Sequence, residues 1–220
     1  MKKVLIGLIV GLLATTMAHA SGGDAASGKS KAVACGACHG ADGNSMVPSF
    51  PKLAGQNERY LIKQMNNIVC GALSADEQKA QKCSGRWVPT MAGQLDNSSA
   101  EDIADIAAYY TSQQSSGGQT KAALAAKGEE IYRAGIGSKS VPACSACHSP
   151  TGKGNGPAGF PALSGQHSDY IAAQLRAFRA AADGLEGRSN DGDSKIMRDI
   201  AYRMSDSEID AVASYINGLH

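Results

Sequence analysis

Two pentapeptides share the spacing C-x-x-C-H, CGACH at residues 35–39 and CSACH at residues 144–148. Cysteines three residues apart and the histidine that follows lie on one face of a helical turn. Two thiols and an imidazole in this arrangement attach a c-type haem, with thioethers to the porphyrin and the imidazole on the iron. The sequence therefore predicts two covalent haem c groups, held by Cys35, Cys38, Cys144 and Cys147, with His39 and His148 as axial iron ligands.

Other interpretations of the motif explain less of the sequence. A zinc site needs a fourth ligand and more often combines two C-x-x-C units in one cluster. A thioredoxin-like redox motif accompanies a βαβ pattern, and no such pattern occurs here. Disulfides inside each motif would explain neither the histidine nor its repetition. Covalent haem accounts for all of these features.

Methionine is the candidate for the remaining axial position of each iron, where it favours the reduced state and closes the iron to other ligands. Only two methionines hold equivalent places in the two halves, each 12 residues before a matching helix residue. These two are Met91 and Met197. They are the predicted axial ligands.

The other methionines after residue 20 fit the role less well. Met65 lies in a predicted helix, where methionine is more often a core residue. Met46 has no counterpart in the second half, and Met204, the rival of Met197, is matched by a serine.

The elements that position these residues occur twice along the chain. The segment FPKLAGQ at 50–56 is matched by FPALSGQ at 160–166, an offset of 110, and a tyrosine follows each four residues later. Apolar periodicity predicts helices at 60–68, 128–134 and 170–181, and a later amphipathic pair at 101–110 and 207–216. Capping-box spacings predict that Ser98 with Glu101, and Ser205 with Glu208, begin this pair. With no alternating run to indicate a sheet, the predicted fold class is all-α.

The composition of successive segments predicts how the chain is divided into a signal peptide, two domains and a linker. Residues 1–20 have two lysines, an apolar run and a final Ala-His-Ala, typical of a signal peptide. The polar segment 114–120 is predicted to be a linker between domains at 21–113 and 121–220. Eleven aromatic residues for two domains indicate thin protein cores, which leaves room for other material.

Charge and hydropathy restrict the partners. Lysine and arginine number 21 against 20 acidic residues, and 19 against 20 without the two signal lysines. This balance argues against nucleic acid and against a charged membrane anchor. No apolar run after residue 20 approaches the ~20 residues that span a bilayer. We expect an exported, soluble protein of the periplasm, with at most peripheral membrane association.

The segments after the haem motifs carry a family resemblance. PKLAG at 51–55 and PALSG at 161–165 are similar to the P-x-L-x-G of class I cytochromes c, in which the proline carbonyl accepts the other N–H of the haem-ligating histidine. The resemblance gives this role to Pro51 and Pro161, and a simple turn is the alternative. The whole chain after residue 20 resembles the di-haem cytochrome c4 family of tandem class I domains.

This resemblance implies a periplasmic electron carrier whose two haems face each other across the domain interface. Its expected donor is a membrane cytochrome bc complex and its expected acceptor a terminal haem-copper oxidase. The alternative is the cytochrome subunit of a flavocytochrome-type dehydrogenase. A third function, that of a di-haem peroxidase, would need one open iron, and the two predicted methionine ligands argue against it. The chain shows no carboxylate pair, nucleophile triad, nucleotide loop or flavin fingerprint, so we expect no enzyme activity and no small-molecule substrate.

Two cysteines remain after haem attachment, Cys70 and Cys83. In an oxidising compartment a disulfide is favoured over two free thiols, and its loop of about 14 residues corresponds to about 3 kcal/mol. Its place before Met91 suggests the hypothesis that it stiffens the ligand loop. The second domain has its own insertion at 135–141, rich in Gly and Ser, which is expected to be a surface loop.

Overall fold

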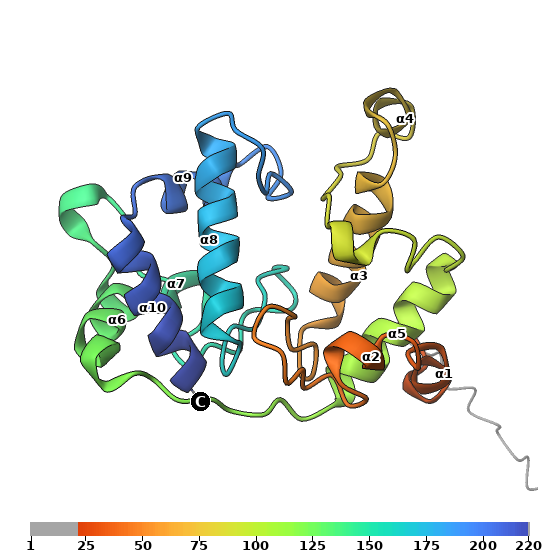
Figure 1. Ribbon diagram of the computed structural model, residues 1–220, viewed down its shortest axis with the longest axis horizontal. Helices are drawn as coiled ribbons and strands as arrows, with labels where there is room; N and C mark the ends of the chain where they lie inside the picture. Colours follow the sequence, from red (N-terminus) through yellow and green to blue (C-terminus); the bar gives the residue numbers. More distant parts are fainter. Residues whose placement is uncertain (1–21, 220) are drawn as a thin grey trace, which may run out of the picture.

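The computed structural model describes residues 22–219, so the predicted signal peptide lies outside the described residues. Two helical lobes are joined by an irregular segment that runs along one side of the molecule (Figure 1). The described residues contain no named β-strand and only two isolated bridges, Ile136 with Val141 and Asn155 with Phe160. The all-α prediction is confirmed. Nowhere in residues 22–219 is a helix both long and apolar enough to cross a membrane.

In the part of the chain that the structure describes, the two lobes share four helices in the same order and differ in the short helices between them. The first contains α1 (Ala25–Lys31), α2 (Gly36–His39), α3 (Glu58–Gly71), α4 (Ala75–Ala80), the 3-10 helix η1 (Pro89–Met91) and α5 (Ala100–Ser112). The second contains α6 (Ala122–Ala134), the 3-10 helix η2 (Gly137–Lys139), α7 (Ser145–His148), α8 (Ser168–Ala182), α9 (Ile196–Tyr202) and α10 (Asp206–Gly218). All five predicted helices are present, as α3, α5, α6, α8 and α10, each longer than its periodic pattern.

Each core forms where the closing helix crosses the first helix of its lobe. α5 packs on α1, and α10 packs on α6. A glycine lies at each crossing, Gly28 against the backbone of Asp105 and Gly128 against the backbone of Ala211. A Cβ atom at either glycine would collide with the backbone of the facing helix, so the close crossing depends on glycine. The predicted apolar faces of α5 and α10 are buried at these crossings.

The caps of the closing helices differ from prediction in one place. Ser205 and Glu208 form the predicted capping box of α10. At α5 the predicted pair, Ser98 with Glu101, is wrong by one residue, because Ser99 caps the helix and Asp102 completes the box. Two capping-box spacings overlap in this segment, and the turn in which the Ser98 N–H donates to the Leu95 carbonyl selects the later one.

An ion pair fastens α1 to α5. The Lys31 ammonium lies 2.6 Å from Asp105 and 2.7 Å from Asp102. The Asp105 side chain is only 6% exposed, and it also accepts a hydrogen bond of 2.6 Å from the backbone N–H of Asp24. The hydrogen bond from Lys31, followed by the one from Asp24, lowers the pKa of Asp105.

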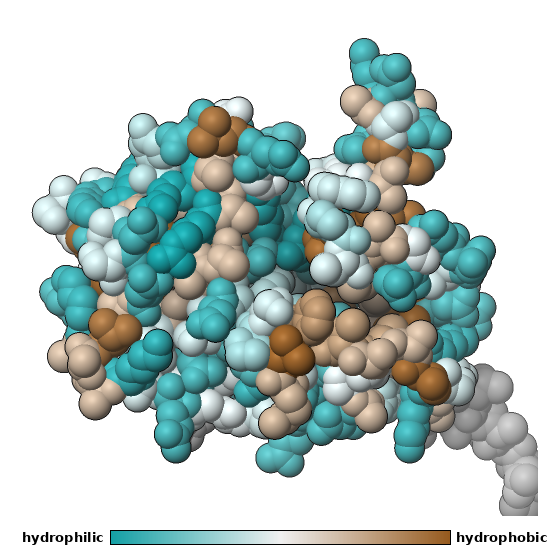
Figure 2. All heavy atoms as spheres, in the orientation of Figure 1, coloured by the Kyte–Doolittle hydropathy of each residue, from teal (hydrophilic) through white to brown (hydrophobic). Residues whose placement is uncertain are grey.

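An arm projects from the first lobe beyond the end of α3. It consists of α4 and its flanking loops and extends away from the body of the molecule (Figure 2). Cys70 and Cys83 form the predicted disulfide at its base. Just after Cys83 in the sequence, the backbone N–H of Arg86 donates to the Asn67 carbonyl of α3 at 2.7 Å. The disulfide therefore anchors the chain segment that continues into η1.

The insertion at 135–141 is more closely packed than a simple surface loop. Ile136 and Val141 pair across its base and are both buried. Lys139 forms a salt bridge of 2.8 Å with Glu208 on α10, and Arg203 donates to the Ser140 carbonyl at 2.9 Å. The loop is thereby fastened to the second core.

Candidate haem sites

Each C-x-x-C-H motif folds as a single helical turn. The backbone N–H of His39 donates to the Cys35 carbonyl, and that of His148 to the Cys144 carbonyl, both at 2.9 Å. This turn brings the thiols and the imidazole to one side, as the spacing predicts. Both imidazoles are buried, and burial lowers the pKa of each.

Each imidazole is oriented by a proline carbonyl. The Nδ1 atom of His39 lies 2.9 Å from the Pro51 carbonyl oxygen, and that of His148 lies 3.0 Å from the Pro161 carbonyl oxygen. Because a carbonyl only accepts, Nδ1 carries the proton and Nε2 is left with a free electron pair. A neutral imidazole with free Nε2 is the form that binds a metal.

The four motif cysteines are unpaired thiols. Burial raises the pKa of the Cys35 thiol, and it raises that of Cys144 to about 11. Two thiols and one free imidazole nitrogen in each domain form the donor set that c-type haem requires.

One continuous cavity of about 830 Å³ joins the two motifs. Its lining includes both motif histidines, both pairs of motif cysteines and apolar side chains of both domains. The hydroxyl of Tyr110, which also lines the cavity, is buried without a hydrogen-bond partner among the described residues. A largely apolar cavity of this size, lined by the thiols and the imidazole of both motifs, fits haem.

Four of the five methionines considered as axial ligands line the cavity. Met91 ends η1, Met197 lies in the first turn of α9, and both line the cavity. Met204, buried just after α9, lines it too. Met65 lines the cavity and packs against the first core, whereas Met46 is 90% exposed.

Comparison with known proteins joins these features to one family. The family model described as Cytochrome c matches residues 25–114 and again residues 125–220. Over 220 residues the chain is 52% identical to cytochrome c4 of Azotobacter vinelandii, covering 100% of both chains. The chain belongs to the cytochrome c4 family. It thus carries two covalently bound haem c groups and transfers electrons.

A solved structure and a more distant relative agree with this assignment. The crystal structure of reduced recombinant cytochrome c4 from Pseudomonas stutzeri matches with a TM-score of 0.82 and 49% identity, covering 90% of this chain and 100% of that one. A thiosulfate dehydrogenase electron acceptor of Stutzerimonas stutzeri is 35% identical over 187 residues, which is 84% of this chain and 78% of that protein.

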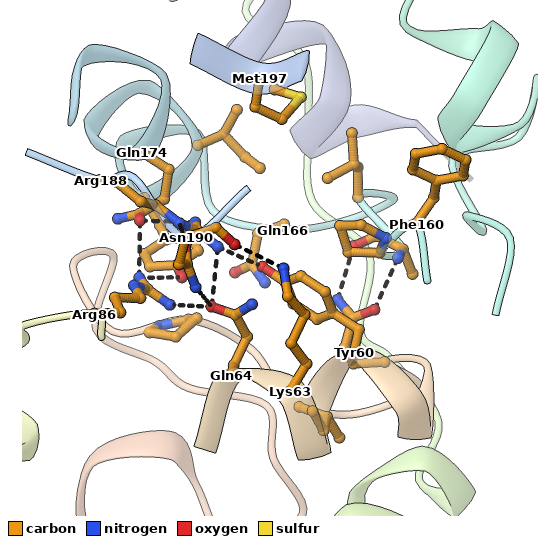
Figure 3. Close-up of a pocket in the computed structure, with 18 of the residues that line it drawn as sticks. Tyr60, Lys63, Gln64, Arg86, Phe160, Gln166, Gln174, Arg188, Asn190 and Met197 are labelled. Atoms are coloured by element: carbon orange, nitrogen blue, oxygen red, sulfur yellow. Dashed lines mark hydrogen bonds between the residues drawn. The ribbon is translucent and has the colours of Figure 1, made fainter. Parts of the chain in front are cut away.

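In this cytochrome c4 family member, Arg86 of the first domain reaches into the second. Its guanidinium donates to Gln64 of its own domain at 2.8 Å. Across the interface it donates to Gln174 at 2.8 Å and to the Tyr170 hydroxyl at 3.3 Å, both on α8 (Figure 3).

Arg188 of the second domain makes the equivalent set of hydrogen bonds. It donates to Gln174 of its own domain at 2.9 Å and, across the interface, to Gln64 and the Tyr60 hydroxyl, each at 3.0 Å. It also donates to Asn190 at 2.9 Å (Figure 3). Burial alone would raise the pKa of Tyr60, but the charges of Arg188 and Arg86 hold that pKa below its ordinary value.

The reciprocal arginines and glutamines were not predicted from the sequence. A signal for them exists, because Gly85-Arg86 and Gly187-Arg188 are a repeated pair at an offset of 102. The pair is obscured because 26 residues separate Tyr60 from Arg86, whereas 18 separate Tyr170 from Arg188. The difference reflects the extra arm of the first domain.

Proposed function

We propose that this chain is a periplasmic electron carrier that accepts electrons from a membrane cytochrome bc complex and delivers them to a terminal haem-copper oxidase. Haem iron supplies a one-electron store that cycles between Fe(III) and Fe(II). The observation that carries the proposal is the single cavity lined by both C-x-x-C-H motifs. Because electron transfer slows steeply with distance, two sites in one cavity favour passage between domains.

The roles of the individual residues belong to the same proposal. Cys35, Cys38, Cys144 and Cys147 hold the two haems, His39 with Met91 and His148 with Met197 are the axial ligands, and Pro51 and Pro161 orient the histidines. The hydrogen bonds from both imidazoles to the proline carbonyls support these assignments. The domains proposed are 21–113 and 121–220, joined by the linker 114–120, after a signal peptide at 1–20.

The domain interface supports transfer between the haems rather than catalysis at one of them. Arg86 and Arg188 hold α3 against α8 through reciprocal hydrogen bonds to neutral oxygens. A fixed interface keeps the distance between the two sites constant. Positive charge beside the cavity also favours the reduced state of nearby iron, since reduction adds an electron.

The ligand assignment is tested by the visible spectrum of the reduced protein before and after addition of carbon monoxide. We expect two haems per chain and no spectral change, because methionine closes both irons. Replacing Met91 or Met197 by alanine should open one haem to carbon monoxide in each variant. Met204→Ala is the matched control and should stay closed. An opened iron in the unmodified protein, or in Met204→Ala, would contradict the assignment.

The direction of transfer is tested with membranes that contain a bc complex and with isolated oxidase. Membranes given a quinol should reduce the protein, and inhibition of the bc complex should prevent this. Oxygen consumption by the oxidase should require the reduced protein. Failure of either half-reaction would overturn the corresponding partner.

A second donor is supported by one specific observation, the 35% identity to a thiosulfate dehydrogenase electron acceptor. In this alternative the chain serves as the cytochrome partner of a dehydrogenase, of the flavocytochrome type or of the thiosulfate-oxidising type. Rapid reduction by such an enzyme and its substrate, together with co-purification, would favour this role. Reduction by the quinol system alone would exclude it.

A further inference from the structure

Two glutamines at matched places in the repeat reach across the domain interface. Gln56 and Gln166 each end an F-P-x-L-x-G-Q segment, and each is only 7% exposed. Gln166 accepts from the backbone N–H of Lys52 and donates to the Lys52 carbonyl, both at 2.9 Å. Gln56 accepts from the N–H of Ala162 at 2.8 Å and donates to its carbonyl at 2.9 Å.

The N–H groups that these glutamines bind belong to two special peptide units. The Lys52 N–H and the Pro51 carbonyl are the two ends of one peptide group, and that carbonyl accepts from His39. In the same way, the Ala162 N–H shares a peptide group with the Pro161 carbonyl, which accepts from His148. Each glutamine is therefore connected, through the two hydrogen bonds of one peptide group, to the histidine of the opposite domain.

We propose that Gln56 and Gln166 are positioning residues through which each domain adjusts the axial histidine of the other. The inference builds on the proposed ligand roles of His39 and His148. Gln166 acts on His39, and Gln56 acts on His148. Docking of the domains thereby becomes part of what sets the two reduction potentials.

The physical basis is the polarisation of an amide by its own hydrogen bonds. When the N–H of a peptide donates, the carbonyl oxygen of that peptide becomes more negative and accepts more strongly, by about 10–30% per bond. A stronger acceptor at Nδ1–H makes the imidazole a better electron donor to its metal. Better donation stabilises Fe(III), so loss of the glutamine should raise the potential of the haem in the other domain.

A change of about 10% in a hydrogen bond of the usual strength in an apolar medium shifts an equilibrium by about twofold, which is the expected change in the Fe(III)/Fe(II) ratio. For a one-electron couple, in which tenfold is 59 mV, twofold corresponds to about 18 mV. A shift of this size is measurable when each haem is followed separately.

The test uses the intact di-haem protein and its Gln166→Met and Gln56→Met variants, which preserve side-chain volume. A redox titration followed by NMR resolves the two haems. Gln166→Met should raise the potential of the haem attached at Cys35 and leave the other unchanged. Gln56→Met should do the reverse, raising the potential of the haem attached at Cys144.

A matched control removes a neighbouring bond across the interface. Asn57 donates from its side chain to the Phe160 carbonyl at 2.8 Å, which is a different peptide group from the one that binds His148. Asn57→Ala should leave both potentials unchanged. A shift of both haems together in either glutamine variant, a shift in the glutamine's own domain, or no shift would overturn the proposal.

A second readout is the Nδ1–H resonance of each histidine in the reduced, diamagnetic protein. In Gln166→Met the resonance of His39 should move upfield and that of His148 should stay, because only one acceptor has weakened. Unmoved resonances would refute the mechanism even if a variant is less stable. Failure of the ligand roles themselves is seen separately, as carbon monoxide binding by the unmodified protein.

Discussion

Gln64 is the acceptor at the centre of the arginine network. Its side-chain oxygen accepts from Arg86 at 2.8 Å, from Arg188 at 3.0 Å and from Asn190 at 3.1 Å. Hydrogen bonds to charged groups contribute about 1.5–3 kcal/mol and neutral ones about 1 kcal/mol, so the three set an upper limit of about 4–7 kcal/mol. Both guanidiniums keep their bonds to Gln174, which reduces the loss.

We therefore expect Gln64→Leu to lower the free energy of unfolding by about 3 kcal/mol, since the buried Arg188 guanidinium and the half-buried Arg86 guanidinium each lose an acceptor. For a chain of this size that loss lowers the Tm by about 6–12 °C. The assay is thermal unfolding of the haem-loaded protein followed by far-UV circular dichroism. Gln64→Glu keeps the acceptor atoms and should remain close to the unmodified protein.

Gln78 supplies the control outside the interface. Its side chain makes one hydrogen bond of 2.9 Å, from the amide to the Leu73 carbonyl in the arm, so Gln78→Leu should cost about 1 kcal/mol at most. The reasoning is refuted if Gln64→Leu costs no more than Gln78→Leu. It also fails if Gln64→Glu is as unstable as Gln64→Leu, because packing rather than hydrogen bonding would then be responsible.

Three further outcomes are expected. Replacing Cys70 and Cys83 by serine removes the disulfide and should lower the free energy of unfolding by about 3 kcal/mol. The same change should speed the exchange of Met91 for added imidazole. An unchanged exchange rate would count against the hypothesis that the disulfide stiffens the ligand loop. Lys52→Met removes three hydrogen bonds of 2.9, 3.0 and 3.1 Å that the buried Lys52 ammonium donates to carbonyls of the linker and the second domain. Limited proteolysis should therefore cut the linker faster in this variant. Cleavage at the original rate would contradict this. Asp105→Asn should destabilise the protein at pH 7, because the pKa of Asp105 is lowered in the folded state, chiefly by its hydrogen bond from the α1 lysine. The stability that the ionised Asp105 contributes is complete above the ordinary pKa of about 3.9 and is lost as pH falls below it. The difference in Tm between the two proteins should therefore narrow below about pH 4. A constant difference down to pH 3 would refute the linkage.

The sequence alone determined the features that depend on short spacings. Cysteines three residues apart and an adjacent histidine fix a haem attachment turn, because one turn of helix decides which side chains share a face. The apolar periods of α5 and α10 identified their buried faces for the same reason. The repeated position of Met91 and Met197 selected them as ligand candidates, and the structure puts both beside the cavity.

Only the tertiary structure decided how the domains communicate. Gln166 binds the backbone of Lys52, 114 residues away, and Arg188 binds Gln64, 124 residues away. No local pattern encodes such pairs, since they depend on the orientation in which α3 and α8 dock. The choice between Ser98 and Ser99 as the cap of α5 was likewise made by the turn that precedes the helix. Local spacing determined which residues could hold the haems, and the docking of the two domains determined which residues of one reach the histidine of the other.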